Sequence, residues 1–163
     1  MAKQLEAVLD GLKSLLDNNL GTAITSLNTE HNDGITLQQP AKIVFGMREA
    51  PMETPMVMIV PGGKTVPEYN GIEGDFGSLI TWRYNIKVII WLTEQEEEIL
   101  QRKTLRYQRA VRETLLNGRE GGTGAYMIKH MEDDVSIIFL ADTSGYAQFS
   151  SVSFELYSEQ IVS

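Results

Sequence analysis

An amphipathic helix is predicted near the start of the chain. Apolar residues recur there at intervals of three and four, and charged residues occupy the opposite side. The spacing continues past Gly21, although glycine costs a helix about 1 kcal/mol relative to alanine, so we expect the helix to end near Asn28. Its apolar positions are Leu5, Val8, Leu9, Leu12, Leu15, Leu16, Leu20, Ile24 and Leu27.

A second helix is predicted from the middle of the chain. Thr93 and Glu96 match a capping box, and four glutamates between 94 and 98 crowd the first turn, where the helix dipole favours negative charge. Asn117 and Gly118 predict its end. The expected buried stripe is Leu100, Tyr107, Val111 and Leu115, and the expected solvent-facing side is Arg102, Arg106, Arg109 and Arg112.

Alternating or continuous apolar stretches predict strands. Pro55–Pro61 is an apolar run with a proline at each end, which predicts a strand that stops at Pro61. In Ile80–Leu92, Trp82, Tyr84, Ile86, Val88 and Ile90 are expected under the helices. The other face of this strand turns apolar at Ile89 and Trp91, as expected for a sheet whose second face is covered only near one end.

Turn residues separate these elements. We interpret 29–54 as an irregular connection with an apolar island at 43–45, and 61–78 as a long glycine-rich loop. Strands at 135–141 and 146–157 flank a turn and predict a hairpin. The order predicts an α+β fold, with a mainly antiparallel β-sheet packed against two amphipathic helices in a single domain, 1–163.

Charge and composition narrow the classes of function. The chain has 14 Lys and Arg against 22 Asp and Glu, a formal charge of -8, which disfavours tight binding to nucleic acid. It has no cysteine, which excludes disulfides and thiolate chemistry. The absence of disulfides is typical of cytoplasmic proteins. No apolar run approaches the roughly 18 residues that span a bilayer, and a signal peptide is not expected.

Motifs for catalysis or cofactor binding are weak. Gly63-Lys64-Thr65 resembles the end of a phosphate-binding loop, but Met58 stands where that loop needs a glycine. The acidic run 132–134 is interpreted as a solvated turn, because no calcium-loop spacing surrounds it. His31 and His130 lie in no hydrolase or zinc motif, although distant residues could still form a Ser/His/Asp site. We therefore expect no enzyme activity, cofactor or metal.

Two features suggest contact with other proteins. The second helix and its end carry six of the fourteen basic residues, which form either a solvated face or an electrostatic seam between like subunits. The loop 61–78 holds apolar residues that a solvated linker does not need, which suggests an arm that contacts a partner. The expected interface residues are Tyr69, Ile72, Phe76, Arg102, Arg106 and Arg109.

The order of elements resembles the tail terminator and neck proteins of long-tailed bacteriophages. The segments that carry the resemblance are the opening helix, the strands at 55–61 and 82–90, the helix around 107–116 and the closing strand at 152–156. The resemblance implies a virion protein that assembles in the host cytoplasm. It would form a homo-oligomeric ring, usually hexameric, at the head-proximal end of the tail tube.

Such a ring would end tube growth and join the tail to the neck, with the tube protein and a neck or head-connector protein as partners. The resemblance also implies a ring through which DNA passes without being bound tightly. The alternatives are another neck or head-completion protein, or a small cytoplasmic enzyme or ligand-binding module. The mass in solution would separate these classes, because a terminator should form a cyclic oligomer.

Overall fold

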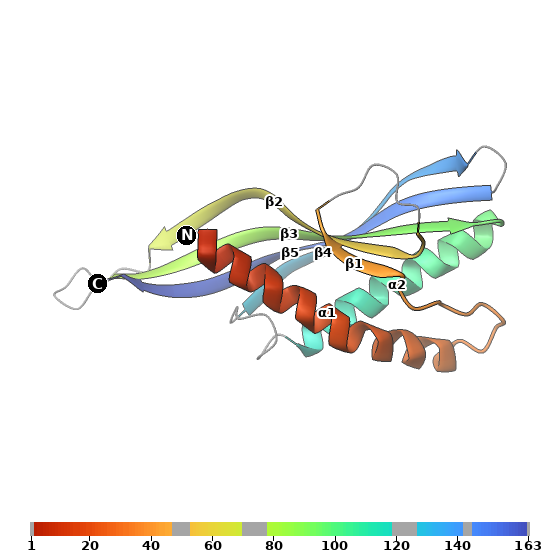
Figure 1. Cartoon of the computed structure of the whole chain (residues 1–163), viewed down its shortest axis with the longest axis horizontal. Coiled ribbons are helices and arrows are strands. Elements are labelled where there is room, and N and C mark those ends of the chain that lie inside the picture. Colours follow the sequence, from red (N-terminus) through yellow and green to blue (C-terminus); the bar gives the residue numbers. More distant parts are fainter. Residues whose placement is uncertain (1, 47–52, 70–77, 119–126, 142–144, 163) are drawn as a thin grey trace.

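Two helices cover one face of a five-stranded sheet (Figure 1). The computed structural model describes residues 2–46, 53–69, 78–118, 127–141 and 145–162. Its elements are α1 (Ala2–Glu30), β1 (Lys42–Phe45), β2 (Met56–Tyr69), β3 (Ser78–Glu94), α2 (Glu97–Asn117), β4 (Met127–Ala141) and β5 (Gly145–Val162). This arrangement confirms the predicted α+β fold.

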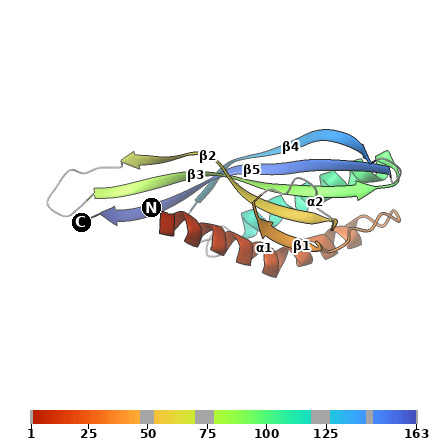
Figure 2. The ribbon, with the colours of Figure 1, turned by 45° about the horizontal axis from the view of Figure 1, so that its top comes forward.

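The strands lie in the order β1-β2-β3-β5-β4, which Figure 2 shows from another side. Among the described strands, only the β1–β2 pair is parallel. β5 follows β4 in the chain but lies between β4 and β3, so it holds the middle of the sheet together. The predicted hairpin of the last two strands is confirmed, with Ala141 paired to Gly145.

The core lies between the sheet and the helices. Val88 pairs with Val152 and Ile86 with Phe154, so alternate residues of β3 and β5 share the face under the helices. Tyr84, Ile86, Val88 and Ile90 are buried as predicted. The side chain of Trp82 lies outside the described part of the structure. Both helices contribute their predicted buried stripes, which continue in α1 through Leu20, Ile24 and Leu27.

The second face of the sheet is covered near one end. Met56 and Met58 belong to this face because they pair with Trp91 and Ile89, and both methionines are buried. Trp91 contacts Phe149 with ring centroids 4.3 Å apart. The switch from polar to apolar residues along β3 therefore marks where this face is covered, as predicted.

β2 continues through most of the segment predicted to be a loop. It does not stop at Pro61 but pairs with β3 as far as Tyr69, with a register shift between Gly62 and Val66. Residues 70–77 lie outside the described part of the chain. The Gly63-Lys64-Thr65 segment is thus part of a strand that continues to Tyr69.

The free edge of β2 explains why the strand accepts prolines. The N–H groups of Ala41 and Gly46 donate to the carbonyls of Pro55 and Ile59, so odd-numbered residues of β2 direct their backbone polar groups toward β1. β1 ends beside Ile59, and Pro61 continues the same alternation. Its missing N–H therefore faces the edge, where no ladder bond is lost.

The predicted capping box is wrong. Thr93 belongs to β3, and its hydroxyl lies 3.1 Å from that of Thr54. Glu96 is the N-cap residue of α2 but makes no side-chain capping hydrogen bond. The glutamates of the first turn, Glu97 and Glu98, remain well placed for the helix dipole. The predicted stop at Asn117 and Gly118 is confirmed.

Candidate interaction surface on helix α2

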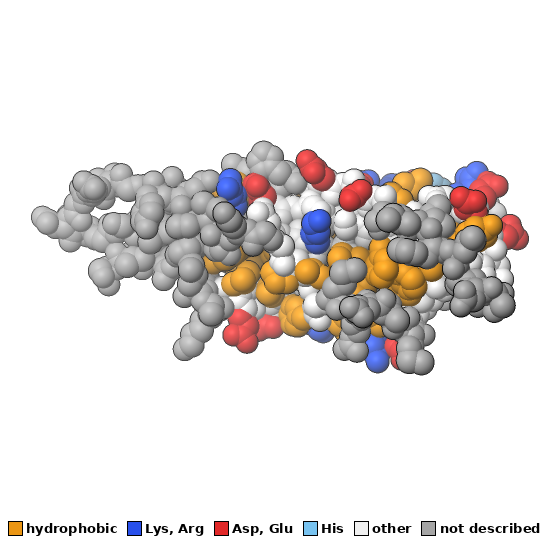
Figure 3. All heavy atoms as spheres, turned by 90° about the horizontal axis from the view of Figure 1, so that it is seen from above, with side chains coloured by type: hydrophobic (Ala, Val, Ile, Leu, Met, Phe, Trp, Pro, Cys, Tyr) orange, Lys and Arg blue, Asp and Glu red, His pale blue; other side chains and the backbone are white. Residues whose placement is uncertain are grey.

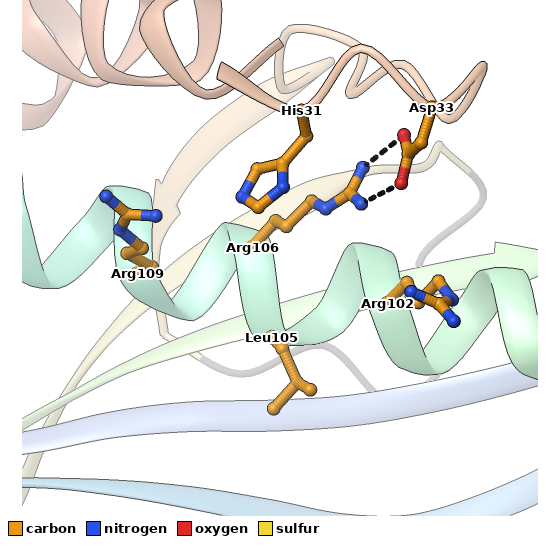
Figure 4. Close-up of a pocket in the computed structure, with 6 residues that line it drawn as sticks. All are labelled: His31, Asp33, Arg102, Leu105, Arg106 and Arg109. Atoms are coloured by element: carbon orange, nitrogen blue, oxygen red, sulfur yellow. Dashed lines mark hydrogen bonds and ion pairs between the residues drawn. The ribbon is translucent and has the colours of Figure 1, made fainter.

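A cavity of about 310 Å³ lies beside α2 and the segment that follows α1 (Figure 4). Three residue types make up its wall: arginines of α2, an exposed leucine, and polar residues after α1. The lining residues are His31, Asp33, Arg102, Leu105, Arg106 and Arg109. The cavity brings the three predicted interface arginines together. No pattern in the sequence indicates that His31 and Asp33 lie beside them.

Arg106 does not lie on the solvent-facing side of α2, contrary to prediction. Its side chain is only 9% exposed and forms an ion pair with both carboxylate oxygens of Asp33. It also donates to the carbonyl of Ile35 at 3.1 Å. The hydrogen bonds from Arg106 hold the pKa of the Asp33 carboxyl at about 2, below its ordinary 3.8. Arg106 therefore fastens the segment after α1 and is an unsuitable contact for a partner.

Arg109 is also engaged within the chain. Its two terminal nitrogens donate to the two carboxylate oxygens of Glu30 at 2.9 and 3.0 Å, and its Nε donates to Glu113 at 2.8 Å. The hydrogen bond from Arg109 lowers the pKa of Glu30, and the bond to Glu30 raises the pKa of Arg109. This is the two-pronged geometry in which guanidinium and carboxylate interact most strongly.

The other basic residues of α2 have partners as well. Arg102 contacts Glu98 at 2.9 Å, Lys103 contacts Glu94 at 2.6 Å, and Arg112 contacts Asp133. Every basic residue of the described helix thus pairs with a carboxylate of its own chain. The predicted basic face is electrically neutralised, so it does not attract anions as a free arginine cluster would. Arg119 lies outside the described part of the chain.

Exposed leucines distinguish this side of the helix. Leu105 is 60% exposed and Leu116 is 43% exposed, although leucine side chains of amphipathic helices normally face the core. Figure 4 shows Leu105 on the side of α2 away from His31 and Asp33. Helical spacing places five residues along one line, which we call the outward stripe: Glu98, Arg102, Leu105, Arg109 and Leu116.

The remaining predicted interface residues belong to another region. The backbone of Tyr69 lies at the end of β2, opposite Ile80, whereas the arginines belong to α2, which lies toward the other end of the molecule in Figure 1. Nothing is described of the Tyr69 side chain, and Ile72 and Phe76 lie outside the described residues. The predicted arm and the helix surface are therefore two separate regions.

A second surface, not recognised from the sequence, lies on the face of the sheet opposite the helices (Figure 3). Ser151 and Ser153 of β5 are small, and they lie between Ile89 and Lys87 of β3 and the acidic residues of β4. Ser153, Lys87 and Ile89 are among the residues that line a depression of about 870 Å³ here, which we call the open-face trough. The serines at alternate positions 151 and 153 are the feature of the sequence that could have indicated a depression on this face.

The acidic run on the wall of the trough is part of a strand. Glu132 and Asp134 belong to β4 and pair with Ser153 and Ser151, so the interpretation of this run as a turn is wrong. Asp133 points to the other face, where it meets Arg112. Among the side chains that the structure describes, no group of three or more His, Asp or Glu is arranged to hold a metal ion.

No family model matches the chain, and no curated protein matches its sequence. In the described part of the chain, neither helix is long and apolar enough to cross a membrane.

Proposed function

We propose that this protein is a tail terminator of a long-tailed bacteriophage. It forms a ring on the head-proximal end of the tail tube, ends tube growth and offers a surface to the neck. The observation that carries the proposal is the arrangement of the elements: the helix, strand and hairpin order that resembles this family occurs in one continuous sheet with both helices on one side.

Projecting strands support a role in assembly. The ends of β2, β3 and β5 pair with one another beyond the helix layer (Figure 1), as Tyr69 with Ile80 and Ser78 with Val162. We call this three-stranded projection the β-arm. A paired projection is stiffer than a loop, and it gives a subunit a preorganised means of reaching a neighbour or the tube.

The surface of α2 supports the same role. Arginine is enriched at protein interfaces, and the exposed leucines beside it offer apolar surface that a partner can bury. The cavity beside them has three guanidinium groups, but they meet the carboxylates of Asp33, Glu30, Glu98 and Glu113. This balance of charge suits contact with a protein better than capture of a small anion.

Tube growth in vitro tests the proposed function. The tail tube protein of the same phage would be polymerised with and without the purified protein, and tube lengths would be measured by electron microscopy. We expect shorter tubes of uniform length with extra density at one end. Ring formation would be followed in parallel by native mass spectrometry.

A variant that shortens the β-arm provides the matched control. Deletion of 66–80, with a Gly-Ser turn joining the shortened β2 and β3, should leave the helix-covered core folded but remove tube capping. Tubes that grow to the same length with or without the wild-type protein, and carry no added density, would contradict the proposal.

A further inference from the structure

The two surfaces described above lie on opposite sides of the sheet. The outward stripe belongs to the helix layer, and the open-face trough lies on the other face. We propose that the open-face trough of one copy receives the outward stripe of a second copy. This inference rests on the ring-forming function proposed above and assigns the contact between its subunits.

Charges of both signs are complementary in this contact. Lys87 forms one wall of the trough, and Glu132 and Asp134 form the other. Among the described residues, none of these three has an ion-pair partner. The stripe presents Glu98 and Arg102 one turn apart. A helix laid in the trough can therefore place the carboxylate of Glu98 against the ammonium group of Lys87. In the same position, the guanidinium group of Arg102 can meet a carboxylate of Glu132 or Asp134.

The stripe can exchange its internal ion pair for an intermolecular one. The side chains of Arg102 and Glu98 are 52% and 75% exposed, and ion pairs this exposed contribute little to stability. Little is therefore lost when Arg102 turns to a carboxylate of the neighbouring copy. Arg109 is held from two sides by Glu30 and Glu113, so we assign the exchange to Arg102.

The trough also suits the exposed leucine. Ser153 is a small side chain on this face of β5, and Val60 and Ile89 add apolar surface beside it. Leu105 is the most exposed large apolar side chain that the structure describes. Its burial against this floor would remove apolar surface from water in both copies.

The geometry explains why such a contact would form a ring. A patch on one face that binds a different patch on the opposite face is head-to-tail, and repetition of a head-to-tail contact closes a ring when the rotation allows it. Pairing through sheet edges is disfavoured: Pro61 blunts β2, and β4 carries charged residues and two register shifts. The two faces remain available for association.

Charge exchange between the two surfaces tests the assignment. The stripe variant is Arg102→Glu, and the trough variant is Glu132→Lys with Asp134→Lys. Self-association would be measured by sedimentation equilibrium and native mass spectrometry over a broad concentration range. We expect each variant to weaken association at least about tenfold. The chain that combines both changes should regain most of that loss, because opposite charges meet again.

Matched controls separate this contact from net charge. Lys13→Glu reverses one positive charge of an i,i+4 ion pair on α1, as Arg102→Glu does on α2. Glu6→Lys with Asp10→Lys reverses two negative charges, as the trough variant does. These controls should associate like the wild type. Urea unfolding of each variant checks that the subunit remains folded.

The outcomes distinguish the contact from the proposed function. Unchanged association in both charge variants, or failure of the combined chain to recover, would overturn the contact even if the wild type forms rings and caps tubes. A wild type that stays monomeric at every concentration would also overturn it. A failure of the wild type to limit tube length overturns the terminator function itself.

Discussion

Among the described glycines, Gly145 is the one where an added side chain would come closest to the backbone of another strand. Its φ is +106°, and a Cβ added there would lie 2.3 Å from the carbonyl oxygen of Glu94. The clash is with the backbone of β3, so no side-chain rotation relieves it. The position therefore requires glycine on two independent grounds.

We expect Gly145→Ala to destabilise the fold by more than the roughly 1–2 kcal/mol that a left-handed backbone costs an L-residue. Gly34→Ala is the matched comparison, because Gly34 also has positive φ, +82°, but no atom lies within 4 Å of its added Cβ. Urea unfolding should give a larger loss for Gly145→Ala. Equal losses would show that the close approach to β3 has no energetic effect.

Ile86 tests the packing of the sheet against the helices. It lies on the covered face of β3, opposite Phe154, with 1% of its surface exposed. Replacement by alanine should cost about 2–5 kcal/mol, because the neighbouring side chains fill the resulting cavity only in part.

Lys87→Ala is the control for this change at a protein concentration where the subunit is monomeric, because Lys87 is the next residue and lies exposed on the other face. It should alter the free energy of unfolding by no more than about 0.5 kcal/mol. A loss below that value for Ile86→Ala would contradict the observed orientation of β3.

At the scale of elements, α2 fastens the segment that joins α1 to β1. Arg106 pairs with Asp33 and also binds the carbonyl of Ile35, and the hydroxyl of Tyr107 donates to the carbonyl of Gln38 at 2.5 Å. Burial is the main cause that raises the pKa of Tyr107 above its ordinary value. These contacts position a stretch that has no regular structure of its own.

This fastening should depend on pH. The pKa of Asp33 is about 2 in the folded protein, against an ordinary 3.8, so the carboxylate stabilises the fold above about pH 4. That contribution is lost as the pH falls toward 2. In Asp33→Asn, the free energy of unfolding should be lower than in the wild type at neutral pH, and the difference should shrink at acidic pH.

Asp10→Asn, at an exposed position of α1, controls for the loss of one carboxylate. Chemical denaturation at several pH values provides the measurement. A constant difference between wild type and Asp33→Asn from neutral pH down to pH 2 would contradict the role assigned to the ion pair.

The helices and the long strand could be predicted from the sequence because their apolar residues recur at the regular spacing of a helix or of a strand. Leu100, Tyr107, Val111 and Leu115 recur along α2 and are all buried, and the alternation in β3 gave the correct covered face. In both elements the packing follows directly from which positions are apolar. The resemblance to phage proteins also came from this order of elements.

The extent of β2 and the place of Arg106 could not be predicted in the same way. Pro61 and Gly62 are turn signals, and only the position of β2 at a free edge makes them compatible with a strand. Arg106 occupies a polar position of its helix, and its burial depends on Asp33, which is distant in the chain. The trough needs three strands side by side, an arrangement that no single segment encodes.

At the scale of the whole molecule, the sheet is protected against growth at its edge. Beyond Ile59 the described structure places no strand beside the outer edge of β2, which would expose backbone donors to other chains. Pro61 and Pro67 each lack such a donor. The subunit therefore avoids uncontrolled pairing while its faces remain open to specific contacts.

Replacing both prolines by valine should restore two edge donors and promote aggregation. We expect light scattering to rise with protein concentration in Pro61→Val with Pro67→Val, because valine favours extended structure and strand addition. Pro40→Val, which adds a donor outside the sheet, should behave like the wild type. If the double variant remains as soluble as that control, the prolines do not protect the edge.

The place of β5 between β3 and β4 has a consequence for synthesis on the ribosome. β3 emerges well before β5, and its register pairs Ser78 with Val162 and Glu94 with Tyr146, across all of α2 and β4. Pairing between such distant residues slows folding, because a long loop must close before the contacts form. Until β5 emerges, one side of β3 has no strand to pair with, and the nascent chain exposes an apolar strand that a chaperone would recognise.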